Sequence, residues 1–372
     1  MTQPDRPYAP APPPAGGQPA PYGPSASYGG YPPGYPVPAW ARVRPDPMPS
    51  EPVEYQHLVR GGRYAWWRPL LTLLLCAGFD LVVQLVAAVG VIVIAVSAGA
   101  GVTGVLQQLS NTSSMGPLTF SVVIIGLVGL IPSAIFASWI VNGVRPRYLA
   151  SVAGGFRWTW LLRCLMITVP VFLIFLALQF VTGWSSGHRP AHWGILLIMV
   201  IIGIPFQSAG EEYAFRGLLL QNVGAWFKNP RVGLVAAMIP SMILFALAHG
   251  SHDPWVFSDL AIFALSSCIA AWRTGGLEAS IALHASNNVL LMIATLLFGG
   301  WDDAFVSSNT IGSPIEPLST LVVNGVCVAL ILWQARRVRL QRRYQPVPHQ
   351  LPSQQVPPMS GRPLTGPGYA GS

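Results

Sequence analysis

Eight long apolar runs constrain the fold of this 372-residue chain more than any other feature of its sequence. A helix needs about 20 residues to cross the hydrocarbon core of a bilayer. In lipid only helices and closed barrels satisfy every backbone polar group, and runs of this length favour helices. The sequence therefore predicts an all-α fold, a polytopic transmembrane bundle of about eight helices. The runs cover about residues 69–98, 117–141, 158–183, 193–223, 232–249, 255–272, 277–299 and 317–335.

The composition agrees with this prediction and excludes an ordinary soluble domain. Hydrophobic residues make up 52% of the chain and charged residues only 9%, whereas soluble domains carry about 25% charged residues. The net charge of +8 would suit a nucleic-acid partner, but the basic residues form short clusters beside the apolar runs, as membrane topology requires. We therefore expect a lipid bilayer as the partner, and no nucleic acid.

The distribution of Lys and Arg predicts the orientation of the spans. Basic clusters alternate with loops that contain neither residue, such as 99–116, 250–254 and 300–316, and only Arg189 departs from the alternation. Basic loops remain in the cytoplasm. We therefore expect a multi-pass protein of the inner (plasma) membrane with both termini cytoplasmic. The basic residues are Arg60, Arg63, Arg68, Arg145, Arg147, Arg157, Lys228, Arg231, Arg273, Arg336, Arg337, Arg339, Arg342 and Arg343.

Two tails of biased composition flank the apolar part. Residues 1–55 are rich in Pro, Gly and Tyr and are expected to form a disordered cytoplasmic tail, because such segments bury too little apolar surface to fold. Residues 344–372 are similar and predict a second disordered tail, which leaves 64–343 as the transmembrane domain. The polar, proline-rich N-terminus does not have the pattern of a cleavable signal peptide. The four cysteines lie in apolar stretches and predict neither disulfides nor a zinc motif.

Three polar motifs lie inside the spans, where a charged group costs at least about 2.5–3.5 kcal/mol and marks a candidate site. The first is GEEYAFRG, which contains Glu211, Glu212 and Arg216. Glu212 and Arg216 are four residues apart and can pair on one helix face. Two carboxylates for one guanidinium leave Glu211 free to face a cavity.

The other two motifs are LFALAHG, with Phe245 and His249, and LEASIALHASNN, with His284 and Asn288. Phe245 lies one helical turn before His249 and can pack against its ring, and His284 and Asn288 share a helix face. At 1.5 Å per residue, His284 and Glu211 lie at a similar depth in the membrane. We expect the polar residues of all three motifs to meet at one level of the bundle.

This set of side chains suits hydrolysis of a peptide bond. A glutamate in a site of low dielectric can act as a general base toward a water, which assigns that role to Glu211. His249 would position the water or protonate the leaving amine, and His284 with Asn288 would donate hydrogen bonds to the oxyanion. No HExxH motif is present. Two histidines and a glutamate also form a known zinc-ligand set, so a zinc site stays an alternative to the expected cofactor-free site.

In these residues the sequence resembles the CAAX-protease and bacteriocin-processing family of intramembrane peptidases. The family pattern is EExxxR, FxxxH and HxxxN in this order, and the resemblance covers about residues 190–300. It implies a glutamate-dependent endopeptidase that opens toward the cytoplasm, with Glu211 activating water and Glu212 and Arg216 supporting it. The histidine of FxxxH, His249, completes the water site, and His284 and Asn288 stabilise the oxyanion. A peptide or a membrane protein would be the substrate.

Several points stay open at the level of sequence. Glu278 stands where related sequences usually have an aromatic residue, which leaves the substrate preference open. The sequence gives neither the cleavage site nor the oligomeric state. A proton-coupled transporter is one alternative function, although no inverted repeat relates the two halves. A non-catalytic membrane scaffold or bacteriocin-immunity protein is another.

Overall fold

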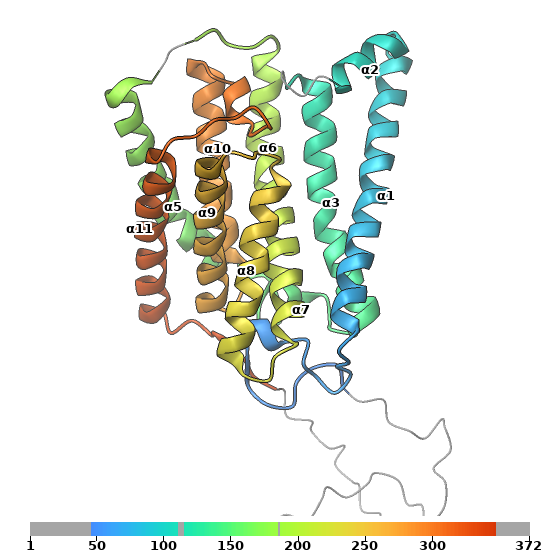
Figure 1. Cartoon of the computed structure of the whole chain (residues 1–372), viewed down its shortest axis with the longest axis vertical. Coiled ribbons are helices and arrows are strands. Elements are labelled where there is room, and N and C mark those ends of the chain that lie inside the picture. The colour runs from blue at the N-terminus through green and yellow to red at the C-terminus, as the bar shows by residue number, and fades with distance from the viewer. Residues whose placement is uncertain (1–45, 111–114, 185–186, 347–372) are drawn as a thin grey trace, which may run out of the picture. The chain divides into compact units, whose positions relative to one another are not determined.

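A computed structural model describes residues 46–110, 115–184 and 187–346 of the chain (Figure 1). Eight helices among these residues are long and apolar enough to cross a membrane. They are α1 (Arg68–Ser97), α3 (Pro117–Asn142), α5 (Trp158–Gly183), the continuous helix Trp193–Gly224, α8 (Pro230–Ala248), α9 (Pro254–Thr274), α10 (Glu278–Phe298) and α11 (Ile315–Arg337). The all-α multi-pass bundle predicted from the sequence is confirmed.

The helix Trp193–Gly224 changes its winding along its length. It begins as α6 (Trp193–Glu212), continues as a π-helical segment, η3 (Tyr213–Leu219), and ends as α7 (Leu220–Gly224). The other described elements are short and lie before α1, between the spans or after α11. They are α2 (Val102–Ser110), α4 (Arg147–Ala150), the 3₁₀ turns η2 (Tyr55–His57) and η4 (Asp302–Ala304), and the strands β1 (Val53–Glu54) and β2 (Arg343–Tyr344).

Local sequence signals set several helix ends. Asn229 and Asp253 cap α8 and α9, and each side chain accepts hydrogen bonds from the backbone N–H groups of the first turn. A proline follows each cap, where its missing N–H costs nothing. α3 and α9 end at Gly143 and Gly275, with φ of 73° and 70°. This left-handed conformation favours glycine because it carries no Cβ.

Helices α6 and α10 form the centre of the bundle. α10 packs against α5, α6 and α9, while α3 packs between α6 and α1. α8 and α11 both pack against α9 (Figure 1). The start of α1, the end of α9 and the end of α11 lie at one end of the bundle, which we call the basic end because Arg68, Arg273 and Arg336 lie there.

Arg189, which breaks the alternation of basic loops, lies at the opposite end of the bundle. Its Nε donates a 3.0 Å hydrogen bond to the carbonyl of Leu297 in the last turn of α10. Its guanidinium also lies 5.0 Å from the ring centroid of Trp193. The last carbonyls of a helix have no partner within the helix, so Arg189 supplies one of them with a hydrogen-bond donor.

Gly210 allows the close approach of α6 to α3. A Cβ at this position would overlap the backbone carbonyl of Leu127 in α3. Because backbone atoms cannot move aside as a flexible side chain can, only glycine fits here without moving the two helices apart.

We expect Gly210→Ala to lower the free energy of unfolding by about 1–3 kcal/mol, the range typical of overpacking in a well-packed interior. Thermal unfolding of the purified protein in detergent measures this loss. Gly194→Ala in the same helix is the matched control, since a Cβ there meets no atom within 4 Å. Equal unfolding midpoints for the two variants would contradict the assigned role of Gly210.

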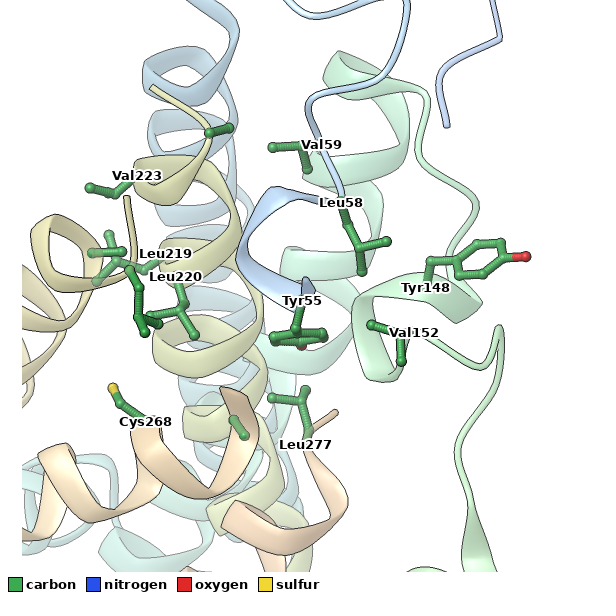
Figure 2. Packing of buried hydrophobic residues seen from close by; sticks show 14 of the residues in the cluster. Tyr55, Leu58, Val59, Tyr148, Val152, Leu219, Leu220, Val223, Cys268 and Leu277 are labelled. Atoms are coloured by element: carbon green, nitrogen blue, oxygen red, sulfur yellow. The ribbon is translucent and has the colours of Figure 1, made fainter. Parts of the chain in front are cut away.

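The segments that precede α1 and follow α11 in the sequence meet at the basic end. There β1, η2 and β2 form what we call the terminal clasp. β1 pairs antiparallel with β2, with Val53 opposite Tyr344 and Glu54 opposite Arg343. Tyr55 is fully buried, and its hydroxyl donates to the carbonyl of Leu149 in α4. Figure 2 shows its ring among buried apolar side chains that include Leu220, Val152 and Leu277. The clasp thus ties both flanking segments to the helices.

The clasp changes the expected boundaries of the folded domain. Residues 1–45 and 347–372, most of the two expected disordered tails, lie outside the described residues. Within the described part of 1–55, however, Met48 and Tyr55 are buried, and so is Tyr344 at the start of the expected C-terminal tail. Sequence composition missed these contacts because few residues make them, and their partners lie far away along the chain.

Glu54 makes the clasp sensitive to acid. Burial raises the pKa of Glu54, but hydrogen bonds from Gln56, Trp272 and Arg343 outweigh burial and hold the pKa below its model-peptide value of 4.5. A group with a depressed pKa contributes stability that is complete above its unfolded pKa and is lost as the pH falls through the folded pKa.

We therefore expect hydrogen exchange of residues 53–57 to accelerate, relative to the helices, as the pH is lowered from about 5 into the range below 4.5. Exchange rates corrected for intrinsic pH dependence measure this change. Glu54→Gln should abolish the dependence, and Glu51→Gln, which changes an exposed carboxylate nearby, should retain it. A clasp whose protection is constant across this range would refute the role of Glu54.

Candidate active site

Glu212, Arg216 and His284 form a buried charged cluster between the central helices. Arg216 Nη1 donates to Glu212 Oε1 at 3.0 Å, and Nδ1 of His284 lies 2.9 Å from the same oxygen. Arg216 and Glu212 are completely buried, and His284 is nearly so. An ionised pair in the membrane interior is tolerated only with such partners. Glu212 therefore joins α10 to the helix that carries the two glutamates.

Glu211 is held differently from its neighbour. Its Oε1 accepts a 2.7 Å hydrogen bond from Gln207 Nε2, one turn earlier in α6. Its Oε2 is buried and has no hydrogen-bond partner among the described residues, and it lies 3.5 Å from His284 Nε2. One oxygen thus fixes the orientation of the carboxylate, while the other makes no hydrogen bond within the described residues.

When His284 is protonated, the four ionisable groups are balanced. Two carboxylates, Glu211 and Glu212, then face two cations, Arg216 and the imidazolium, whose ring nitrogens point at one carboxylate each. A neutral total is what a buried ionic cluster requires, since any uncompensated charge would carry a large desolvation cost.

The π-helical segment begins directly after these glutamates. η3 runs from Tyr213 to Leu219 and contains Arg216. A π-turn closes through an i→i+5 hydrogen bond and is frequent at functional sites. It interrupts the regular α-helical ladder at the position where the chain passes from the carboxylates to the guanidinium.

Phe245 lies at the centre of an aromatic cluster beside the charged groups. The Arg216 guanidinium lies 4.3 Å from its ring centroid, a cation–π distance. The centroids of His249 and His284 lie 4.8 and 5.8 Å from it, and that of Phe263 in α9 lies 5.8 Å from it. Phe245 therefore packs against both histidines of the motifs.

His249 stands at the C-terminal end of α8. Its Nδ1 lies 2.8 Å from the carbonyl of Phe245, to which it donates as Nδ1–H. That bond leaves Nε2 as the ring atom available for a water or a substrate. Among the described residues His249 makes no direct contact with a carboxylate, and its connection to His284 runs through Phe245.

Asn288 lies one turn beyond His284 on α10 and is only partly buried. Its Oδ1 accepts a 3.0 Å hydrogen bond from Asn287 Nδ2. This bond orients the amide, and its NH₂ group has no partner among the described residues, so both protons are available for donation.

The structure thus brings Glu211, Glu212, Arg216, Phe245 and His284 into one connected cluster, with His249 and Asn288 at its edges. Sequence reasoning missed Gln207, although a polar residue four positions before Glu211 within a membrane span was a usable signal. It also missed Phe263, whose ring lies 5.0 Å from that of His284. No periodicity or motif distinguishes Phe263 from the other apolar residues of its span.

The zinc alternative needs three ligands within reach of one ion. Among residues 46–110, 115–184 and 187–346, no three His, Cys, Asp or Glu side chains form a group that could hold a metal. Glu211 and His284 are neighbours, and both histidines contact the ring of Phe245.

Glu278, where the sequence departs from the pattern of related chains, is buried at the start of α10. Arg157 binds it through Nε at 2.9 Å and Nη2 at 2.6 Å, and the Arg157 backbone N–H donates to it as well. Glu278 therefore anchors the start of α10 to the start of α5, six residues before His284.

An apolar cavity of about 460 Å³ is lined by residues of the helices that carry the site. One wall carries Pro205, Ala209 and Tyr213 from the glutamate-bearing helix, and the facing wall carries Ala285 and Val289 from α10. These residues flank Glu211 and His284 in sequence. The cavity therefore offers space for an apolar chain along the two helices that carry the glutamates and His284.

Comparison with known proteins finds a family match for the part of the chain that carries the three motifs. Residues 191–290 match the model of a family described as "Type II CAAX prenyl endopeptidase Rce1-like". This segment includes every residue of the three motifs. The uncharacterized protein YyaK of Bacillus subtilis (strain 168) is 28% identical over 155 residues.

That alignment covers 40% of this chain and 51% of YyaK, so the chain matches about half the length of this curated relative. No solved structure matches the chain. The family resemblance predicted from the motifs is thus confirmed where the motifs lie: residues 191–290 are similar to the Rce1-like type II CAAX prenyl endopeptidases.

Proposed function

We propose that this multi-pass membrane protein is an intramembrane endopeptidase in which Glu211 activates a water for attack on a peptide bond. The observation that carries the proposal is the geometry of Glu211. Gln207 holds one carboxylate oxygen, and the other is buried without a hydrogen-bond partner among the described residues, 3.5 Å from His284 Nε2. A carboxylate held in this way can bind a water and accept its proton.

The proposed reaction begins when Glu211 Oε2 takes a proton from this water. The water oxygen forms a bond to the carbonyl carbon, and the electron pair of the C=O bond moves to the oxygen. Collapse of this tetrahedral intermediate breaks the C–N bond, and the proton passes from Glu211 to the leaving amine. His249, with Nδ1 bound to the Phe245 carbonyl, offers Nε2 to position the water.

The oxyanion needs donors that are already oriented before it forms. The Asn288 amide meets this requirement, because Asn287 fixes its oxygen and leaves its NH₂ group free. His284 supplies the second donor through Nε2–H when both of its ring nitrogens carry a proton, with Nδ1 still 2.9 Å from Glu212 Oε1. Glu212 and Arg216 act as positioning residues that hold this imidazole.

Substrate and orientation form part of the same proposal. The apolar cavity on the helices that carry the charged cluster suits a peptide that carries, or lies next to, an apolar chain, such as a membrane-associated substrate. The basic end of the bundle faces the cytoplasm of the plasma membrane under the positive-inside rule. Both termini would then be cytoplasmic.

Cleavage of fluorogenic peptides by the purified protein in lipid tests the function, with prenylated and unmodified C-terminal peptides in parallel. We expect cleavage to persist after treatment with excess chelator, because the base, the positioning groups and the oxyanion donors are all side chains of this protein. Activity that disappears with chelator and returns with zinc would replace this mechanism with a metal-dependent one. A wild-type protein that cleaves neither peptide class would favour the scaffold or transporter alternatives.

A further inference from the structure

We propose that the basic end of the bundle contains a binding site for the phosphate headgroup of an anionic phospholipid, built by Arg273, Arg336, Arg339 and Arg342. The site lies between the ends of α9 and α11, away from the glutamates of the candidate active site. It does not depend on the proposed peptidase activity.

The site is a cavity of about 370 Å³ with a mixed lining. Four arginines surround it, and no acidic residue lines it. Its remaining walls are the apolar side chains Leu332, Ala335 and Leu340. Guanidinium groups match phosphate oxygens in shape and charge, and the apolar side chains of the same lining would contact the acyl chains of a bound lipid.

The backbone after α11 is bent so that the arginines converge. Arg339 has a φ of 50°, a left-handed conformation that a residue with a side chain rarely adopts. Leu340 N–H donates to the carbonyl of Ala335, and Arg157 Nη1 donates to the carbonyl of Gln341. β2 then pairs with β1. These bonds turn the chain back over the end of the bundle and bring Arg342 to the cavity that Arg273 lines.

No acidic side chain forms an ion pair with the four arginines of the cavity within the described residues. None of the four guanidinium groups has an ion-pair or hydrogen-bond partner there, whereas the adjacent Arg343 pairs with Glu54. Burial and the charge of Arg273 lower the pKa of Arg342, the charge of Glu54 opposes them in part, and the pKa stays below its usual value. The chain that follows, residues 345–372, contains no Asp or Glu. Membrane topology requires basic residues near this end, but not their convergence on one cavity.

A lipid phosphate fits this place better than a free one. The arginines lie at the ends of two membrane spans, where the headgroup layer of one leaflet begins. Basic pockets between transmembrane helices are typical headgroup sites. A free phosphate would use the guanidinium groups but leave the apolar walls uncovered.

Native mass spectrometry of the full-length protein in neutral detergent tests the proposal. The probes are dioctanoyl phosphatidylglycerol, dioctanoyl phosphatidylcholine and inorganic phosphate. The test variant is Arg273→Gln/Arg336→Gln. The matched control is Lys228→Gln/Arg231→Gln, which removes two charges from the same end of the bundle but outside the cavity. Arg339→Gln serves if the double variant does not fold.

We expect one phosphatidylglycerol to bind the wild type saturably. Its apparent Kd should rise about 25-fold in the test variant, or about fivefold for Arg339→Gln, which corresponds to ~1 kcal/mol for each basic residue near the headgroup. The control should stay within about twofold of wild type, and phosphatidylcholine should bind much more weakly. Equal effects in the control and the test variant, or none in either, would overturn the proposal. Inorganic phosphate that displaces the lipid at equal concentration would show a site for a soluble anion instead.

Discussion

Glu211→Gln is expected to reduce peptide cleavage about 10³-fold, within the 10²–10⁴ range that general-base catalysis contributes. The amide cannot accept the proton of the attacking water. It can still accept the hydrogen bond that Gln207 donates to Glu211, so the fold should be retained. Steady-state cleavage rates, compared with unfolding midpoints of the same preparations, separate the loss of catalysis from a loss of structure.

Two further glutamate variants make this experiment specific. Glu51→Gln changes an exposed carboxylate outside the spans and should leave the rate at the wild-type value. Glu212→Gln should reduce both the rate and the unfolding midpoint, because it removes the partner shared by Arg216 and His284. A Glu211→Gln protein that cleaves at the wild-type rate would exclude Glu211 as the base.

Arg216→Met is expected to lower the free energy of unfolding by about 3–5 kcal/mol, the typical cost of removing one partner of a buried ion pair. The substitution leaves Glu212, which is completely buried, without the guanidinium 3.0 Å away. It also removes the cation that lies over the Phe245 ring. Chemical unfolding in mixed micelles, followed by fluorescence, measures the change.

A double-mutant cycle isolates the ionic part of this loss. Glu212→Gln/Arg216→Met removes both charges and should be more stable than the sum of the single losses predicts, with a coupling of up to about 3 kcal/mol. Arg147→Met is the control for removing an arginine. Its guanidinium lies 5.4 Å from the ring centroid of Tyr148 and is in no ion pair within the described residues, so a change of at most about 0.5 kcal/mol is expected. Additive effects in the cycle would show that the two charges do not stabilise each other.

Local patterns in the sequence were sufficient to predict the spans and the residues of the charged cluster. Each apolar run is long enough to cross the membrane by itself, because a membrane helix satisfies its backbone without help from other segments. The Glu212–Arg216 pair lies within one helix, so its four-residue spacing predicted it. The cost of a charge in the membrane distinguished Glu211 and His284 from the surrounding apolar residues. These predictions needed only the order of the residues and the energetic cost of placing polar groups in lipid.

Contacts between distant parts of the chain were decided by the tertiary structure alone. The two glutamates are adjacent in sequence, yet Glu212 binds Arg216 and His284 while Glu211 keeps an open oxygen beside the same imidazole. Tyr55 is buried among residues from distant parts of the chain, and Arg273 converges with Arg342, for the same reason. No local pattern encodes such contacts, because helix packing and the turns between elements set the distances. The sequence by itself therefore determined which groups enter the membrane, and the tertiary structure determined which of them touch.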